Sequence, residues 1–186
     1  MFAYLGKLRK EGRTLIPVSI NVSRLHAYDE KLTETLLRLR EEYDVLPEYV
    51  PLELTESAFL EDEVGMYRRM ESLRERGFLV SMDDFGTGYS NISCALSLPF
   101  EYIKLDRSLL VRLPGDSKVQ VFVRSMVETF HAMGQKIVAE GVEEEEQIEL
   151  LRQFGVDCVQ GYYYGKPMPE DEFRAAVAKG WEEQRR

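Results

Sequence analysis

The sequence predicts a parallel α/β fold of the (β/α)-barrel type, and two regularities of the chain lead to this prediction. Six short apolar runs each end on an acid, an amide or a lysine, at intervals of roughly twenty to thirty-five residues. Segments whose apolar residues recur at helical spacing separate these runs. Because strands that alternate with helices form a parallel sheet, the chain should contain six strand–helix units. An eight-unit barrel would then lack its first two strands.

Strands are expected where the apolar runs lie, since each run has the length of one strand. In chain order, the predicted strands are Pro17–Asn21, Val50–Thr55, Phe78–Met82, Tyr102–Leu105, Lys136–Ala139 and Val156–Gln160. A glycine-bearing loop, Asp84–Ser90, follows the third strand. In a barrel of this type the carboxyl ends of the strands converge on one face. The residues that end the runs should therefore share one site.

Helices are expected between the strands, and glycine marks the end of several of them. They are predicted at Met1–Glu11, Glu30–Glu42, Glu61–Arg76, Lys118–Met133, Glu144–Phe154 and Glu170–Lys179. No N-cap residue precedes the first helix, so the chain is expected to begin inside a helix. The helix at 118–133 should bury one face, formed by Val119, Phe122, Met126, Val127, Phe130 and Met133.

Length and composition indicate a single globular domain over residues 1–186. Apolar residues make up 44% of the chain and charged residues 31%, and the formal net charge is -9. The negative charge can serve solubility, or part of it can bind metal ions; composition leaves both interpretations open. An acidic chain repels nucleic acid, so no DNA partner is expected, and a phosphate-bearing ligand would need cations at its site.

Cysteine and histidine usage argues against a structural zinc site. Cys94 and Cys158 form no C-x-x-C pair, and His26 and His131 are isolated in the sequence. Two cysteines expected to be free suit a reducing cytosol, so a cytoplasmic location is expected. No apolar stretch has the length of a membrane span and no signal-peptide pattern opens the chain. No membrane contact is therefore expected.

Three of the predicted strands carry an oxygen ligand at or near their ends, namely Asn21, Glu53 and Asp83. Carboxylate and amide oxygens suit Mg²⁺, Ca²⁺ or Mn²⁺. Any one of them alone is more often a surface acid or a loop cap. Three matching positions favour a metal site, because strand ends in this architecture point into one small space.

Asp84 directly follows Asp83, and Lys104 and Asp106 end the next strand. Neighbouring side chains on an extended strand face opposite ways, but a turn at the strand end would let both aspartates reach a metal pair. A turn-initiating aspartate is the alternative. Lys104 and Asp106 should share a face, where the lysine either offsets the acids in a salt bridge or orients and helps to deprotonate an attacking water. The two roles are compatible.

Glu140 and Glu143 flank Gly141-Val142 after the fifth predicted strand. Glu143 also begins an acidic run whose remaining members, Glu144, Glu145 and Glu146, are expected to form the first turn of a helix. Glu140 lies on the strand end itself and is the better candidate for a metal ligand or a base.

Six motifs occur in an order that resembles the EAL domain, a bacterial phosphodiesterase that cleaves cyclic di-GMP. They are SINVS, ELTES, DDFGTGYSN, IKLDRS, VAEGVE and QGYYYGKPMP, within about Val18 to Phe173. The resemblance implies a modified TIM-type (β/α) barrel with two divalent cations, Mg²⁺ or Mn²⁺. It also implies attack by water on one phosphodiester bond of cyclic di-GMP, which gives linear pGpG.

The resemblance also assigns roles to positions of this chain. Asn21, Glu53 and Asp83 would bind one metal ion, and Asp84 would serve the second. Lys104 would position the water, with Glu140 as a further acidic participant. Asp106 and Gln160 would complete the site, and Glu56 would anchor the loop Asp84–Ser90, which in this family couples the site to dimerisation. Glu143 is a further candidate for site support.

One departure from the family bears on activity. No Glu-Ala-Leu motif occurs, so its metal-binding glutamate, a substrate-binding arginine and two strands would lie upstream of Met1. We therefore expect an N-terminally truncated domain with impaired hydrolysis. The alternative is a catalytically inactive remnant that binds cyclic di-GMP or a protein. A metal-dependent aldolase or lyase on a similar barrel would explain the acids but not the motif order.

Expected partners are cyclic di-GMP and, in the full-length protein, an upstream sensor or GGDEF-type domain. Six strands would leave two sheet edges unpaired, so a homodimer or larger homo-oligomer is expected to cover them.

Overall fold

A computed structural model describes residues 1–29, 31–55, 58, 62–87 and 92–178. Its sheet has six parallel strands in the order β1-β2-β3-β4-β5-β6, which confirms the predicted α/β architecture. In chain order the elements are α1 (Phe2–Lys10), β1 (Ile20–Asn21), α2 (Arg24–Ala27), α3 (Leu32–Tyr43), the short 3-10 helix Pro47–Tyr49, β2 (Leu52–Thr55), α4 (Glu63–Glu75), β3 (Val80–Phe85), α5 (Ile92–Ser97), β4 (Tyr102–Leu105), α6 (Arg107–Leu110), α7 (Ser117–Ala132), β5 (Lys136–Glu140), α8 (Glu145–Phe154), β6 (Cys158–Gln160) and α9 (Glu170–Ala178).

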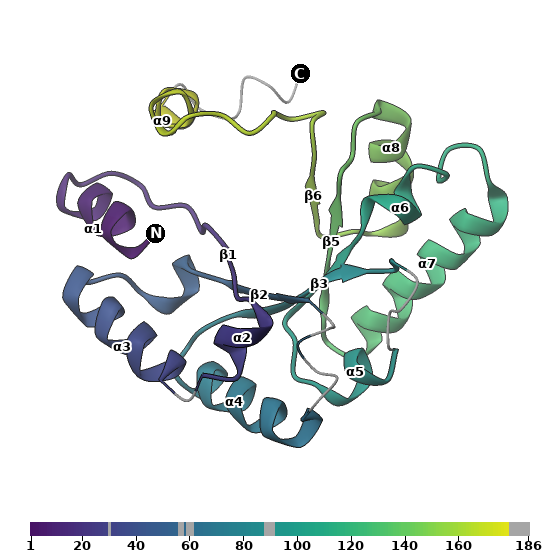
Figure 1. The fold of residues 1–186 in the computed structure, drawn as a ribbon. Helices are drawn as coiled ribbons and strands as arrows, with labels where there is room; N and C mark the ends of the chain where they lie inside the picture. The colour runs from purple at the N-terminus through teal and green to yellow at the C-terminus, as the bar shows by residue number, and fades with distance from the viewer. Residues whose placement is uncertain (30, 56–57, 59–61, 88–91, 179–186) are drawn as a thin grey trace.

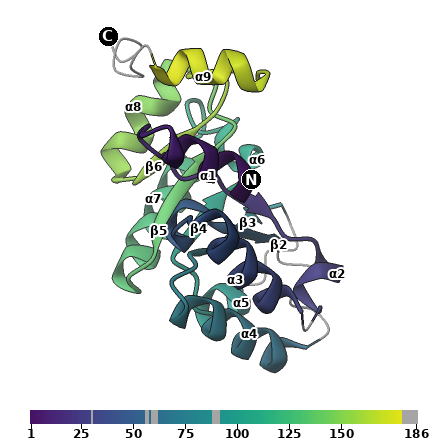
Figure 2. The same ribbon diagram turned by 90° about the vertical axis from the view of Figure 1, so that its left-hand side faces the viewer.

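The strands form part of a barrel wall, with helices α3, α4, α5, α7 and α8 around its outer side (Figure 1). The second view shows α9 near the top of the molecule, α4 near the bottom and α1 between them (Figure 2). Parallel register pairs every strand with the next one along the chain. The carboxyl ends of all six strands therefore lie at one edge of the sheet.

The hydrophobic core lies between the sheet and the helices that cover it. Leu52 and Leu54 of β2 and Ile103 and Leu105 of β4 are almost completely buried. Glu53, between the two leucines of β2, faces the opposite side of the sheet because successive side chains alternate. The inner side of the sheet is thus left for polar residues. In the described part of the chain, no helix is long and apolar enough to span a membrane.

The prediction of which residues form the buried face of the long helix α7 was partly wrong. Val127 and Phe130 are buried in α7, as predicted, but Phe122 is 52% and Met133 40% exposed, and Val123 is completely buried instead. The sequence at 119–123 is apolar at four of five positions, so helical spacing does not decide which side faces the sheet.

The prediction that β3 ends at Met82 was also wrong, since β3 continues to Phe85. Its pairing with β4 shifts register between Met82 and Phe85, and Asp84 has a left-handed backbone with φ of 58°. Such an irregularity bends a strand and turns its side chains. Asp83 and Asp84 lie within it. Sequence patterns do not signal a bulge, so the strand was expected to end before it.

Candidate active site

The side chain of Lys104 is the centre of the candidate site. Its Nζ lies 2.8 Å from Glu53 Oε1, 3.0 Å from Asp83 Oδ1 and 2.8 Å from Glu140 Oε1. The three carboxylates come from β2, β3 and β5, and Lys104 comes from β4 between them. The lysine side chain is only 6% exposed and the carboxylates 11–17% exposed. Four neighbouring strands therefore contribute to one ion-pair cluster, which we call the Lys104 cluster.

Burial and charge act in opposite directions on the pKa of Lys104. Burial alone would lower this pKa, but the hydrogen bonds to Glu140, Glu53 and Asp83 outweigh it and raise the pKa above its ordinary value. The ammonium therefore stays charged. Burial raises the pKa of Glu140 to about 7, although the bond to Lys104 opposes the rise. The neighbouring charge of Asp83 also raises the pKa of Glu140.

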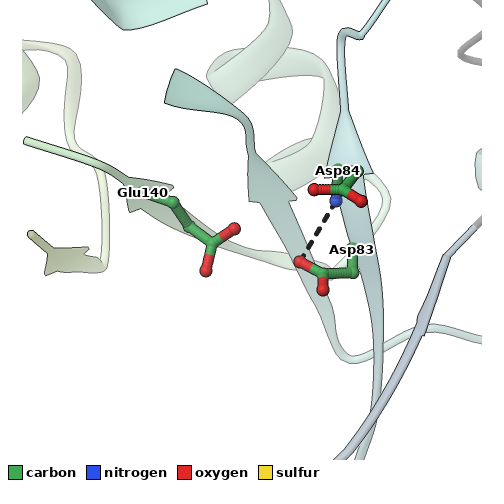
Figure 3. Close-up of side chains that lie close together, drawn as sticks. All are labelled: Asp83, Asp84 and Glu140. Carbon is green, nitrogen blue, oxygen red and sulfur yellow. Dashed lines mark hydrogen bonds between the residues drawn. The ribbon is translucent and has the colours of Figure 1, made fainter. Parts of the chain in front are cut away.

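Asp84 adds a fourth carboxylate beside the Lys104 cluster. Asp83, Asp84 and Glu140 each offer an oxygen atom, and these three atoms all lie within 4.8 Å of one another (Figure 3). Asp83 Oδ1 accepts a 3.1 Å hydrogen bond from the backbone N–H of Asp84, which holds the turn. Burial and the charges of Asp83 and Asp106 raise the pKa of Asp84. The irregularity in β3 therefore lets the carboxylates of two adjacent aspartates lie close together, whereas a regular strand would point them to opposite faces.

The other predicted site residues lie around this group. Asn21 is exposed on the edge strand β1, in register with Glu53. Gln160 is exposed on the opposite edge strand β6, in register with Glu140. Asp106 caps α6, where its Oδ1 accepts a 2.8 Å hydrogen bond from the backbone N–H of Ser108. All three therefore lie at the ends of strands that border the Lys104 cluster.

Glu143 forms an ion pair with Arg107 at 2.9 Å rather than a contact with Lys104. Glu144 is the N-cap of α8, in a capping box with Gln147, and Glu145 and Glu146 lie in its first turn, as predicted. Glu56 and part of the loop Asp84–Ser90 lie outside the described residues. Arg107 and Gln147 had not been predicted as part of the site. The signals in the sequence were the place of Arg107 in the IKLDRS motif and the spacing of Gln147 three residues after Glu144, which is that of a capping box.

The composition of the site fits hard divalent cations. Glu53, Asp83, Asp84 and Glu140 offer four carboxyl groups against the single ammonium of Lys104. Carboxylate oxygens are the ligands that Mg²⁺, Mn²⁺ and Ca²⁺ prefer. Since the group has excess negative charge and lies at the carboxyl edge of the sheet, it can accept cations together with an anionic ligand.

The fold and this group of side chains define a protein of the (β/α)-barrel class with an acidic site at the carboxyl ends of its strands. The family model for the EAL domain matches residues 1–167, so the chain belongs to the EAL domain family. This confirms the resemblance carried by the six motifs.

Known proteins with this fold are similar along most of the chain. The EAL domain of Mycobacterium smegmatis DcpA superimposes with a TM-score of 0.89 at 32% identity, covering 96% of this chain and 81% of that one. A cyclic di-GMP complex of the phosphodiesterase PaMucR has a TM-score of 0.83 at 31% identity, covering 92% and 70%.

Relatives of known sequence extend far beyond the matched region. Cyclic di-GMP phosphodiesterase PA2567 of Pseudomonas aeruginosa is 35% identical over 151 residues, which are 81% of this chain and 26% of the relative. Oxygen sensor protein DosP of Escherichia coli is 30% identical over 168 residues, which are 90% of this chain and 21% of the relative. The chain therefore spans about a fifth to a quarter of the length of these two relatives.

Proposed function

We propose that this chain is a cyclic di-GMP phosphodiesterase domain that uses Mg²⁺ or Mn²⁺ to hydrolyse one phosphodiester bond and release linear pGpG. One observation carries the proposal: a buried ammonium is held by three carboxylates from three strands, with a fourth carboxylate beside them. The names of the P. aeruginosa relative and of the PaMucR complex support this substrate for the family's site.

The carboxylates and amides at the strand ends would hold the cations. Asn21, Glu53 and Asp83 are proposed for one ion, and Asp84 with Asp106 for the second. When bound, such cations neutralise phosphate charge and lower the pKa of a water molecule. The excess of carboxylates over ammonium in this group supports this assignment, since their repulsion is relieved when a cation binds.

The chain's own residues orient the reacting groups. Lys104 keeps its proton, so its ammonium can donate a hydrogen bond that positions a water molecule but does not act as a base in this form. Glu140 contacts the same ammonium and, as a carboxylate, can bind a cation or accept a proton from that water. Gln160, in register with Glu140, offers an amide to the ligand at the edge of the site.

The test is direct hydrolysis. The chain is incubated with cyclic di-GMP and MnCl₂ or MgCl₂, and pGpG is separated by ion-exchange chromatography. Glu53→Gln and Lys104→Met serve as the variants, because each removes a charge while keeping most of the side-chain volume. We expect metal-dependent formation of pGpG by the parent chain. In both variants the rate of pGpG formation should be lower by at least about 100-fold, as for groups that position reactants.

The outcomes separate the enzyme from the alternatives. Saturable binding of cyclic di-GMP without hydrolysis would support a binding module instead. If the chain shows no binding of cyclic di-GMP and no hydrolysis, the proposal for this chain is refuted. The proposal includes a cytoplasmic location, a homodimer or larger homo-oligomer, and a sensor or GGDEF-type domain in the longer protein, in keeping with relatives such as the oxygen sensor DosP.

A further inference from the structure

Two strand-end connections next to the Lys104 cluster are tied together by side chains that have no part in the proposed chemistry. The first connection joins β4 to α6 and carries Asp106. The second joins β5 to α8 and follows Glu140 directly. Helix α6 contacts β5, and both of its ends are attached to the second connection. We call these attachments the α6 clamp.

Arg107 makes the first attachment. It is the first residue of α6, and its Nη2 lies 2.9 Å from Glu143 Oε2. Its aliphatic stem packs on Gly141, where an added Cβ would lie 2.6 Å from Arg107 Cβ and 2.7 Å from Cγ. Gly141 has a left-handed φ of 68°, which glycine adopts without strain. Arg107 thus covers the turn that begins one residue after Glu140.

Gln147 makes the second attachment and is almost completely buried. Its Oε1 accepts hydrogen bonds from the backbone N–H groups of Glu143 and Glu144, at 2.9 and 3.0 Å. Its Nε2 donates a 2.9 Å hydrogen bond to the carbonyl oxygen of Leu110, the last residue of α6. A buried amide whose oxygen accepts two hydrogen bonds and whose nitrogen donates one fixes the relative position of the segments it joins.

We infer that Arg107 is a positioning residue that holds the Glu140–Glu143 turn against α6 and so keeps the Glu140 carboxylate beside those of Asp83 and Asp84. This inference rests on the proposed function. An exposed ion pair contributes little to global stability, and the side chains of Arg107 and Glu143 are 55% and 38% exposed. Loss of the pair should therefore act on the site more than on folding.

The test compares Arg107→Ala and the exchanged pair Arg107→Glu/Glu143→Arg with the parent chain. The matched control is Arg112→Ala. Arg112 also forms an exposed ion pair, with Asp116, but in the connection from α6 to α7, outside the α6 clamp. Three quantities are measured: the Mn²⁺ affinity by calorimetry, hydrogen exchange of the 141–147 amides, and kcat and KM for cyclic di-GMP.

We expect Arg107→Ala to weaken Mn²⁺ binding and lower kcat by about 10–100-fold, as for partners that orient metal ligands. KM should change by less than about two-fold, because ground-state contacts to the substrate are kept. Exchange at 141–147 should accelerate. The exchanged pair should recover most of each loss, and Arg112→Ala should match the parent.

Two results would overturn the inference: parent-like Mn²⁺ affinity and exchange in Arg107→Ala, or no recovery in the exchanged pair together with equal losses in Arg112→Ala. Failure of the proposed function is distinguishable. If the parent chain forms no pGpG while Arg107→Ala still weakens Mn²⁺ binding and accelerates exchange, the function fails and the positioning role of Arg107 stands.

Discussion

Replacing Lys104 by Met removes the only positive charge of the Lys104 cluster while keeping most of the buried side-chain volume. The ammonium contacts three carboxylates within 3.0 Å and is almost completely buried, so little solvent screens its loss. Removing one partner of a buried ion pair costs about 3–5 kcal/mol, because the remaining charge is left uncompensated. We therefore expect the free energy of unfolding to fall by about this amount near pH 7.

The pH dependence of this loss follows from the charges. In the parent chain the pKa of Lys104 is raised, so its stabilising contribution is present below the unfolded pKa and constant across neutral pH. In the variant, loss of the ammonium should raise the pKa of Glu140 further, because the bond to Lys104 opposes the rise to about 7 in the parent chain. Protonation of Glu140 should stabilise the fold at low pH, and this contribution should be lost as the pH rises. The deficit relative to the parent should thus shrink at about pH 5 and be largest at about pH 8.

Urea unfolding with EDTA present, at both pH values, measures the effect. Arg38→Ala is the control, because Arg38 pairs with Glu42 on the exposed surface of α3 and should cost no more than about 0.5 kcal/mol. A Lys104→Met deficit below about 1 kcal/mol, or one that does not depend on pH, would refute the reasoning that this ammonium compensates buried carboxylates.

Asp157→Ala should lower stability by about 1–2 kcal/mol at pH 7, because the pKa of Asp157 is lowered by the N–H of Ile137 and by His131 despite burial. Urea unfolding should show that difference vanish as pH falls below the ordinary aspartate range. Gly161→Ala should lower the Tm by several degrees, since its Cβ would lie 2.0 Å from the carbonyl oxygen of Val142; a parent-like Tm in differential scanning calorimetry would contradict this. Light scattering should report a dimer or larger assembly that covers the free edges of β1 and β6, and a stable monomer at high dilution would rule this out.

Several features of the candidate site could be predicted from the sequence because they depend on local signals. Glu53, Lys104 and Glu140 each follow or lie in a short apolar run that has the length and composition of a strand. Parallel strands that alternate with helices share one carboxyl edge, so these residues had to lie at the same edge of the sheet. The roles proposed for them in catalysis stay predictions.

Other features of the site depend on contacts that no local pattern encodes. The carboxylates of Asp83 and Asp84 both lie close to that of Glu140 because β3 shifts register against β4 and Asp84 takes a left-handed backbone. Arg107 packs on Gly141 because α6 returns over the end of β5. Neither arrangement leaves a periodic signal in the sequence.

The sequence by itself determined that this chain is an alternating α/β protein with acids and a lysine at its strand ends, because helix and strand periodicity follow from the geometry of the backbone. The tertiary structure alone decided that Val123 rather than Phe122 lies on the buried face of α7. It also decided that one buried ammonium contacts Glu53, Asp83 and Glu140. The physical reason is that burial and ion pairing depend on which segments meet in space. Strand register and helix packing determine which segments come into contact, and both involve residues far apart in the chain.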